Sequence, residues 1–269
     1  MHVPPMCVCG NIFRGKTLAS VSKNLFSVAG KTALITGGGS GIGGFMAQSL
    51  ADEGASILLV GRREDKLKEV LGGRDGSIFV IDLSEAGASQ RLFKMVTDRG
   101  YQPDIIVNAA GINPRLHADE IDEDMWNYTV HLNLNVPFLV AQKFVPAMQA
   151  NRWGRIINIA SMQSSRAFPN GISYGAAKGG VTQLTRAMAE AWSALGVTAN
   201  ALAPGFFPTD LTSALFADPK TAADLASRTA MGRNGKLEDL RGPLLFLASD
   251  AGAYITGQMI NVDGGMTAK

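Results

Sequence analysis

The stretch KTALITGGGSGIGG at residues 31–44 decides the fold class of this chain of 269 residues. Its apolar half ends at Thr36, and a glycine-rich turn followed by a helix-forming segment comes directly after it. Glycines permit a tight turn and let the backbone approach a pyrophosphate, while the next helix offers its first N–H groups to the phosphates. The order of strand, glycine loop and helix predicts a dinucleotide-binding crossover, made by Gly37, Gly39, Ser40, Gly41, Ile42 and Gly43.

Outward from this stretch, short apolar runs alternate with helix-length segments. The expected strands are 31–36, 56–60, 77–81, 104–107, 154–160, 197–202 and 258–262. The expected helices are 42–53, 64–71, 85–98, 122–150, 174–195 and 238–249. Several strands are apolar at successive positions, as in a parallel sheet buried on both faces. We therefore expect an α/β fold, a Rossmann-type doubly wound parallel sheet with helices on both faces, in a single domain from 25 to 269.

Residues 205–235 interrupt this alternation. They contain FF and LTSALF and several alanines, which indicates short helices inserted before the next regular unit. An insertion after the carboxyl end of a strand can form a lid or a pocket wall. An ordinary surface excursion is the alternative.

Charge and cysteine usage exclude several classes of protein. The 25 basic and 23 acidic residues give a net charge of +2 without a run of one sign, so no nucleic-acid surface is expected. No apolar run reaches the roughly 18 residues of a membrane span. Cys7 and Cys9 offer two ligands where a structural zinc site needs four, so no metal site is expected. A cytoplasmic protein with a small-molecule substrate is the resulting expectation.

Residues 1–24 precede the first strand and differ from the rest in charge. They carry Arg14, Lys16 and Lys23 but no acidic residue, and the first acidic residue of the chain is Asp52. An acid-free basic start is typical of an organelle transit peptide, but this one has a single arginine and a Pro-Pro pair. We expect an irregular N-terminal tail, with organelle targeting as the alternative.

The end of the second strand bears on the choice of cofactor. Gly61, Arg62 and Arg63 follow it, where an NAD site usually places a carboxylate for the adenosine 2′-hydroxyl. Guanidinium groups bind a 2′-phosphate through charge-assisted hydrogen bonds. The sequence favours NADP(H), and NAD(H) stays open because the arginines could also be a solvated pair.

Tyr174 and Lys178 stand four residues apart in SYGAAKGG (173–180), so on a helix both would face the same cleft. Ser161 follows the strand at 154–160, at the edge where α/β sites are built. A fixed ammonium and a cationic nicotinamide both favour the phenolate, so Tyr174 could exchange a proton with an oxygen that Ser161 holds. A helix surface pair is the alternative for Tyr174 and Lys178 alone. Together with the glycine loop, the three residues predict an oxidoreductase site.

From about Leu25 to its C-terminus the chain resembles the short-chain dehydrogenase/reductase family. The family's motifs occur in order as Thr36-Gly-x-x-x-Gly-Ile-Gly43, Asn108-Ala-Ala-Gly111, Ser161, Tyr174-x-x-x-Lys178 and Pro204-Gly205. The resemblance implies a sheet of about seven parallel strands, catalysis by Asn133, Ser161, Tyr174 and Lys178 and, usually, a homotetramer. Asn133 is similar to the family's asparagine that anchors a water connected to the lysine. Asn135 competes by residue type, but the spacing to Phe138 favours Asn133.

The resemblance also implies the remaining cofactor contacts. Tyr174 and Lys178 belong to them as well. It implies that Asp82 and Leu83 lie beside the adenine. It implies that the residues beside the ribose are Asn108, Ala109, Ala110 and Gly111, and that those over the nicotinamide are Pro204, Gly205, Phe207 and Thr209. Val136 replaces a frequent glycine of the family, which leaves the chemistry unaffected.

The substrate pocket is expected after Ser161 and in the inserted segment, with Met162, Arg166 and Phe206. The sequence around Tyr174 and Pro204 is most similar to the branch of the family that contains gluconate 5-dehydrogenases. Arg166 could pair with a sugar-acid carboxylate or be a solvated loop residue. A 3-oxoacyl-carrier-protein reductase is the alternative enzyme, and a protein that senses NADP(H) without turnover is the alternative from another class.

Overall fold

Seven parallel strands make one sheet in the computed structural model, which describes residues 24–269. The strands are β1 (Thr32–Thr36), β2 (Ser56–Gly61), β3 (Gly76–Val80), β4 (Ile105–Asn108), β5 (Gly154–Ile159), β6 (Val197–Pro204) and β7 (Met259–Val262). Their order across the sheet is β3-β2-β1-β4-β5-β6-β7, with every neighbouring pair parallel. The predicted α/β fold class is confirmed, and the expected strands lie within two residues of the observed ends.

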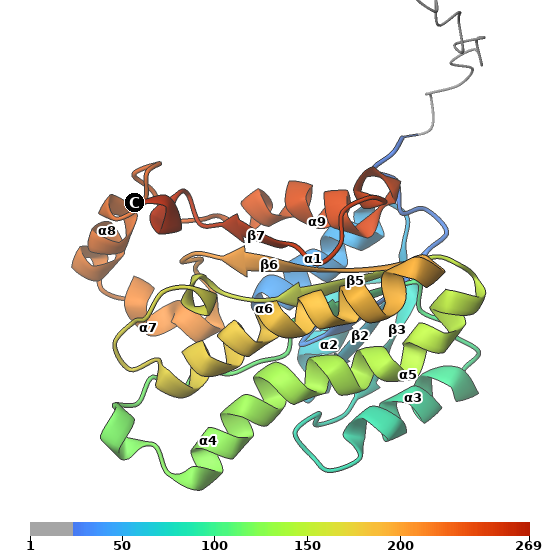
Figure 1. Cartoon of the computed structure of the whole chain (residues 1–269), viewed down its shortest axis with the longest axis horizontal. Helices are drawn as coiled ribbons and strands as arrows, with labels where there is room; N and C mark the ends of the chain where they lie inside the picture. Colours follow the sequence, from blue (N-terminus) through green and yellow to red (C-terminus); the bar gives the residue numbers. More distant parts are fainter. Residues whose placement is uncertain (1–23) are drawn as a thin grey trace, which may run out of the picture.

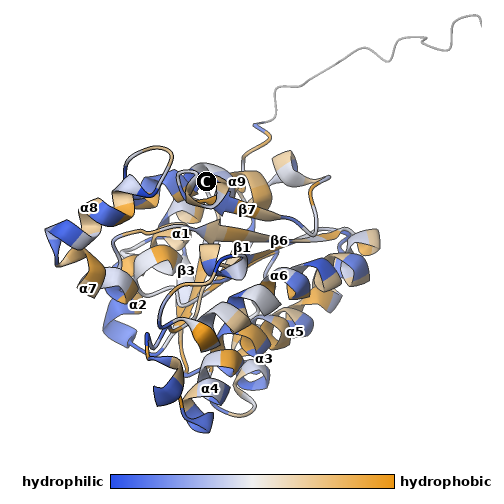
Figure 2. Cartoon of the chain, turned by 60° about the vertical axis from the view of Figure 1, so that its left-hand side comes forward, coloured by the Kyte–Doolittle hydropathy of each residue, from blue (hydrophilic) through white to orange (hydrophobic). Residues whose placement is uncertain are grey.

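Helices cover both faces of the sheet because its strands are apolar on both. They are α1 (Gly41–Asp52), α2 (Glu64–Leu71), α3 (Ala88–Asp98), α4 (Glu123–Val130), α5 (Val136–Ala150), α6 (Ile172–Trp192), α7 (Ser213–Phe216), α8 (Pro219–Ser227) and α9 (Arg241–Ala248). Leu34 of β1 packs in the core with α3, α5 and α6, whereas Ala33 and Ile35 pack in the core with α1, α2 and α9. Figure 1 shows these layers, and Figure 2 shows the apolar strands between them.

The strand order places a cleft at the carboxyl edge of the sheet. After β3 the chain crosses from one side of β1 to the other, so β1 lies between β2 and β4. Loops that leave these neighbouring strands run to opposite faces of the sheet and open a crevice between them. The glycine loop after β1 lies in this crevice, as the sequence predicts.

The expected helix at 122–150 contains an irregular turn. α4 continues into α5 through a π-helical turn, His131–Asn135, in which the N–H of Val136 donates to the carbonyl of His131, five residues before it. Pro137 follows directly and has no N–H, so it cannot continue the regular bonding pattern of an α-helix. Asn133 lies inside this turn.

The inserted segment contains the short helices that the sequence predicts. After β6 the chain forms a 3-10 turn (Asp210–Thr212) and then α7 and α8, before it returns through α9 to the edge strand β7. Phe207 anchors the start of this segment, since its side chain is buried and would be 2.5 Å from a Cβ atom at Gly235. The segment therefore lies over the carboxyl edge (Figure 1).

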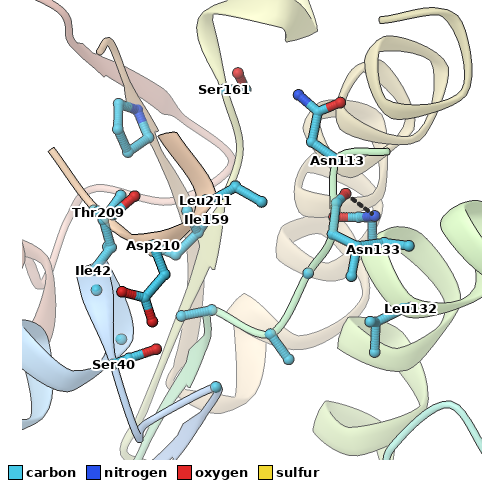
Figure 3. Close-up of a pocket in the computed structure, with 18 of the residues that line it drawn as sticks. Ser40, Ile42, Asn113, Leu132, Asn133, Ile159, Ser161, Thr209, Asp210 and Leu211 are labelled. Carbon is cyan, nitrogen blue, oxygen red and sulfur yellow. Dashed lines mark hydrogen bonds between the residues drawn. The ribbon is translucent and has the colours of Figure 1, made fainter. Parts of the chain in front are cut away.

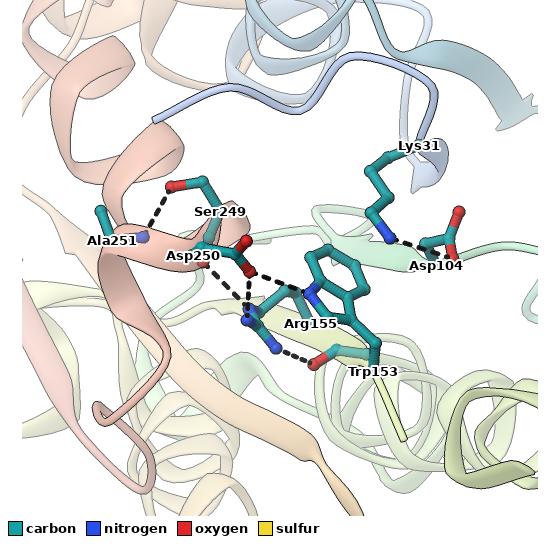
Figure 4. Close-up of polar contacts among 8 residues, drawn as sticks. Lys31, Asp104, Trp153, Arg155, Ser249, Asp250 and Ala251 are labelled. Atoms are coloured by element: carbon teal, nitrogen blue, oxygen red, sulfur yellow. Dashed lines mark hydrogen bonds and ion pairs between the residues drawn. The ribbon is translucent and has the colours of Figure 1, made fainter. Parts of the chain in front are cut away.

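A cluster of charged and aromatic side chains closes the opposite, amino edge of the sheet (Figure 4). The indole of Trp153 lies between Lys31, whose Nζ is 3.7 Å from the ring centroid, and Arg155, whose Cζ is 4.3 Å from it. Asp250 Oδ1 accepts hydrogen bonds from Trp153 Nε1 at 3.0 Å and from Arg155 Nη2 at 3.3 Å. The cluster ties the start of β5 to the turn after α9.

The predicted tail at 1–24, with Cys7, Cys9 and the possible targeting signal, lies outside the described residues except for its last position. Within residues 24–269, no helix combines the length and the apolar character needed to cross a bilayer.

Candidate active site

A cleft of about 530 Å³ opens at the carboxyl edge of the sheet. It is bounded by the glycine loop, the ends of β2 and β3, the loop after β4, the start of α6 and the inserted segment. Figure 3 shows side chains of the glycine loop, such as Ser40, and of the inserted segment, such as Thr209, across the cleft from Asn133. The predicted residues that line it are Gly37, Gly39, Ser40, Gly41, Ile42, Gly43, Arg62, Arg63, Asp82, Leu83, Ala109, Ala110, Gly111, Asn133, Ser161, Met162, Tyr174, Lys178, Pro204, Gly205, Phe206, Phe207 and Thr209. Segments that are far apart in the sequence thus meet in one cleft.

The glycine loop is packed too tightly for side chains at two positions. Gly37 has φ +66°, and a Cβ atom there would lie 2.9 Å from the Cα of Ala110. A Cβ atom at Gly43 would lie 2.3 Å from the carbonyl oxygen of Gly37. These contacts bring the start of α1 against the end of β1 and leave backbone N–H groups at the cleft. The loop fits a pyrophosphate by its shape and by the helix start behind it.

Two arginines at the end of β2 face the cofactor side of the cleft. Arg63 Nη2 donates to Ser40 Oγ at 3.0 Å and to Asp210 Oδ2 at 3.4 Å, and Arg62 Nη1 is 3.5 Å from Asp82 Oδ2. Burial would raise the pKa of Asp82, but hydrogen bonds from Ser84 and the charge of Arg62 lower it below its usual value. Arginines and a serine hydroxyl together fit a phosphate on the adenosine ribose.

Tyr174 and Ser161 meet near the centre of the cleft. Burial raises the pKa of the Tyr174 phenol above its usual value, while the Ser161 hydroxyl and the positive charge of Arg115 act in the opposite direction. Ser161 Oγ itself accepts a hydrogen bond from the N–H of Gln163 at 3.1 Å, which fixes its position at the end of β5. Within the chain alone, the phenol is therefore held in its protonated form.

Lys178 lies behind Tyr174 on the same face of α6. Its side chain is buried, its Nζ is 5.6 Å from the centroid of the Tyr174 ring, and it donates to the carbonyl of Ile159 at 2.6 Å. Burial lowers the pKa of Lys178 to about 8. The sequence predicts that this ammonium favours the phenolate; in the structure Arg115 is a second cation, and its charge acts against the rise that burial causes in the pKa of Tyr174.

Asn133 reaches the same region from the π-helical turn. Its Nδ2 donates to the carbonyls of Ile112 and Thr129, both at 2.9 Å, and its Oδ1 is buried without a hydrogen-bond partner. A Cβ atom at Gly111 would lie 2.5 Å from this Oδ1 and 3.8 Å from Lys178 Nζ. Asn133 Oδ1 thus lies beside Lys178 with its capacity to accept a hydrogen bond unused within the described chain. A buried acceptor at this position could take part in a path that carries protons to or from the lysine.

Two predicted residues lie elsewhere. Asn108 is buried under the cleft, where its Nδ2 donates to Asn158 Oδ1 at 2.9 Å and supports the loop at 109–111 from below. Arg166, expected in the substrate pocket, lies in a second cavity beside the cleft, where it donates to the carbonyl of Met266. The short turn Met162–Ser164 after β5 carries the following residues away from Tyr174.

Arg115 was not predicted and lines the cleft. It stands in the loop after β4 with φ +54°, a backbone conformation that few non-glycine residues adopt. Its charge acts on the phenol of Tyr174. The residues INPR at 112–115 form no motif that indicates a functional site. The one sequence signal for Arg115 is that it is an arginine in a loop that follows a strand.

Comparison with known proteins agrees with this geometry. A family model described as enoyl-(acyl carrier protein) reductase matches residues 37–267. Gluconate 5-dehydrogenase of Gluconobacter oxydans is 37% identical over 250 residues, 91% of this chain and 97% of the relative. A 3-oxoacyl-[acyl-carrier-protein] reductase of Rickettsia felis is 33% identical over 242 residues, 90% of this chain and 99% of the relative.

Among solved structures, a gluconate 5-dehydrogenase from Burkholderia cenocepacia, in complex with NADP and tartrate, superposes with a TM-score of 0.86. The two sequences are 38% identical, and the match covers 91% of this chain and 98% of that one. The fold and the cleft define a dinucleotide-dependent oxidoreductase that acts on CH–OH groups. The chain belongs to the short-chain dehydrogenase/reductase family, as its motifs predict.

Proposed function

We propose that this protein is an NADP(H)-dependent dehydrogenase that interconverts a secondary alcohol and a ketone on a sugar acid. The observation that carries this proposal is the position of Arg115, a cation in the same cleft as Ser161 and Tyr174. A sugar acid offers a hydroxyl or ketone for the serine and the tyrosine and, a few atoms away, a carboxylate for a guanidinium. The relatives named gluconate 5-dehydrogenase support this substrate class.

The nicotinamide, when bound, supplies the hydride acceptor or donor. The chain's residues provide the rest of the chemistry. Ser161 holds the reacting oxygen by a hydrogen bond, and Tyr174 gives a proton to that oxygen during ketone reduction and takes it back during alcohol oxidation. Lys178 and Asn133 lie behind the phenol, at the point where a proton would leave the cleft.

Cofactor choice follows from the end of β2. Arg62, Arg63 and Ser40 bring three side chains with hydrogen-bond donors to where a 2′-phosphate would lie, and the β2 sequence itself ends without a carboxylate. The related gluconate 5-dehydrogenase structure contains NADP, which supports the same preference here. NAD(H) is the weaker cofactor in this proposal.

A 3-oxoacyl-carrier-protein reductase is the second candidate, because the family model and one of the relatives carry acyl-carrier-protein names. Its thioester substrate has no carboxylate at the reacting end, so Arg115 would have no partner in the cleft.

The test is a substrate panel that follows NADPH absorbance with 5-ketogluconate, other keto sugar acids, ketoacyl thioesters and neutral ketones. Arg115→Met should raise the KM for sugar acids roughly tenfold or more and change neutral ketones little, because a lost charged hydrogen bond costs about 1.5–3 kcal/mol. Arg166→Met is the matched variant; a rise in the KM for sugar acids there, with none in Arg115→Met, would assign the carboxylate to the second cavity. Turnover of ketoacyl thioesters without turnover of sugar acids would support the 3-oxoacyl-carrier-protein reductase.

Localisation and assembly are part of the same proposal. We infer one catalytic domain from 25 to 269, a cytoplasmic location, a small-molecule rather than a nucleic-acid partner, and a homotetramer. The open side of β7 supports assembly, since this edge strand pairs only with β6 among the described strands. Light scattering on the purified full chain should give four times the mass of one chain, and a monomer would contradict the assembly.

A further inference from the structure

Asp210 lies over the cofactor side of the cleft, although it belongs to the segment that follows β6. Figure 3 shows its carboxylate directed toward Ser40 of the glycine loop. Asp210 Oδ2 accepts a hydrogen bond from Arg63 Nη2 at 3.4 Å, and the same nitrogen donates to Ser40 Oγ. A carboxylate thus rests beside the two groups that would receive an anionic phosphate.

The other arginine has a carboxylate partner of a different kind. Asp82 is 3.5 Å from Arg62, but it is also held by Ser84, whose N–H and hydroxyl donate to Asp82 Oδ1 at 2.9 and 2.7 Å. The carboxylate of Asp210 has Arg63 as its only hydrogen-bond partner within residues 24–269, and its side chain is 72% exposed. Asp82 is fixed in place, whereas Asp210 can leave Arg63 without breaking another contact.

We propose that Asp210 is a specificity-determining residue that competes with the 2′-phosphate of NADP(H) for Arg63. This inference rests on the proposed function, in which Arg63 binds that phosphate. The phosphate must displace the carboxylate from the guanidinium and then tolerate its negative charge nearby. NAD(H) carries a hydroxyl at the same position and meets neither obstacle. Asp210 therefore reduces the preference for NADP(H) that the two arginines create.

The competition also reaches the substrate side of the cleft. Asp210 begins the turn that follows Thr209, and Thr209 packs against the glycine loop, with its Cβ 3.4 Å from a Cβ atom built at Gly41. Phe206 lies on the same segment and lines the cleft. A phosphate that takes Arg63 from Asp210 thus releases one of the contacts that hold the substrate wall to the cofactor site.

The experiment is a fluorescence titration of the full chain with NADPH and with NADH at low salt. In Asp210→Asn the ratio of the NADH to the NADPH dissociation constant should rise about three- to tenfold, as expected for removal of one exposed charge a few ångströms from the phosphate. Asp224→Asn is the matched control: it removes a carboxylate of α8 that pairs with Arg228, the residue after this helix, and should leave the ratio unchanged. Added salt should shrink the difference.

A double-mutant cycle separates competition for Arg63 from a general effect of charge. In the Arg63→Ala background, Asp210→Asn should change the ratio much less, because only the repulsion between the carboxylate and the phosphate is left to remove. An equal rise with and without Arg63, or no rise in Asp210→Asn while the wild type prefers NADPH, would overturn the role of Asp210 and leave the proposed function intact. A wild type without any preference for NADPH, together with no rise of the ratio in Asp210→Asn, would overturn both.

Discussion

Two buried polar side chains at opposite edges of the sheet, Arg155 and Asn133, differ in how their hydrogen bonds are satisfied. At the amino edge, the buried guanidinium of Arg155 donates to the carbonyls of Ser249 and Gly154 and to Asp250, and its flat face covers Trp153. At the carboxyl edge, Asn133 keeps a buried oxygen without a partner. The Arg155 guanidinium is paired within the chain, and the Asn133 oxygen is not.

The difference separates residues that hold the fold from residues that perform chemistry. A buried polar group that is fully paired stabilises its surroundings and has no capacity left for a ligand. A buried acceptor without a partner costs stability unless something else binds it. We therefore expect substitutions at the carboxyl edge to change rates, and substitutions at the amino edge to change stability.

The largest expected effect is that of Tyr174→Phe. Removal of the proton donor should lower kcat about a thousandfold, within the range that general acids contribute, and should leave NADPH affinity and thermal stability nearly unchanged. Tyr101→Phe is the matched control, because its hydroxyl bonds to Ser77 at 2.8 Å away from the cleft. Single-turnover kinetics and thermal melts measure both properties. Retained turnover in Tyr174→Phe would contradict the role of Tyr174 as the proton donor.

Trp153→Ala should produce the reverse pattern at the amino edge. Loss of the ring between two cations should lower the free energy of unfolding by about 2–3 kcal/mol, while kcat at 25 °C stays that of the wild type. Trp126→Ala, on the exposed side of α4, should cost much less. Denaturant unfolding measures the stability of each variant, and activity assays measure its kcat. A large loss of kcat in folded Trp153→Ala would contradict the expectation that substitutions at the amino edge change stability and not rate.

Gly111→Ala tests the contact between Asn133 and the loop after β4. A methyl group 2.5 Å from Asn133 Oδ1 must displace that side chain, so kcat/KM should fall roughly tenfold, as small misplacements at a site do. Gly242→Ala is the control, since nothing lies within 4 Å of its added Cβ and it is helical. Equal activity in both variants would show that Asn133 does not need its present position.

The smallest expected effect is on the pH profile of ketone reduction. This direction needs a protonated Tyr174 and a charged Lys178, and burial lowers the pKa of the lysine to about 8. The rate constant kcat/KM should be level below pH 8 and fall about tenfold per unit above it. Lys178→Arg keeps its charge at every pH tested, so it should be slower but lose the fall near pH 8. A fall that persists there would belong to another group.

Most of the fold could be predicted because its signals are local. A strand such as β5 is apolar along its length, and the glycine loop must be glycine because its backbone passes within contact distance of Ala110. The spacing of Tyr174 and Lys178 places both on one face of α6, and both line the cleft. Each of these depends on residues that are neighbours in the chain.

The remaining features depend on contacts between distant segments. Arg115 and Asp210 reach the cleft only because two loops fold over it, and neither has a pattern around it. Arg166 was assigned to the substrate pocket from its nearness in sequence to Ser161, but the turn after β5 directs it toward Met266. Loop direction follows from tertiary packing, which residue spacing does not encode.

The π-helical turn at His131–Asn135 has a consequence for evolution of this protein. Its single wide turn lets the stretch before Pro137 hold one residue more than regular winding allows. Loss of one residue here would rotate the whole of α4 by about 100° relative to α5, and Asn133 would face away from Lys178. In related chains, amino-acid substitutions in this stretch should therefore be tolerated more readily than insertions or deletions.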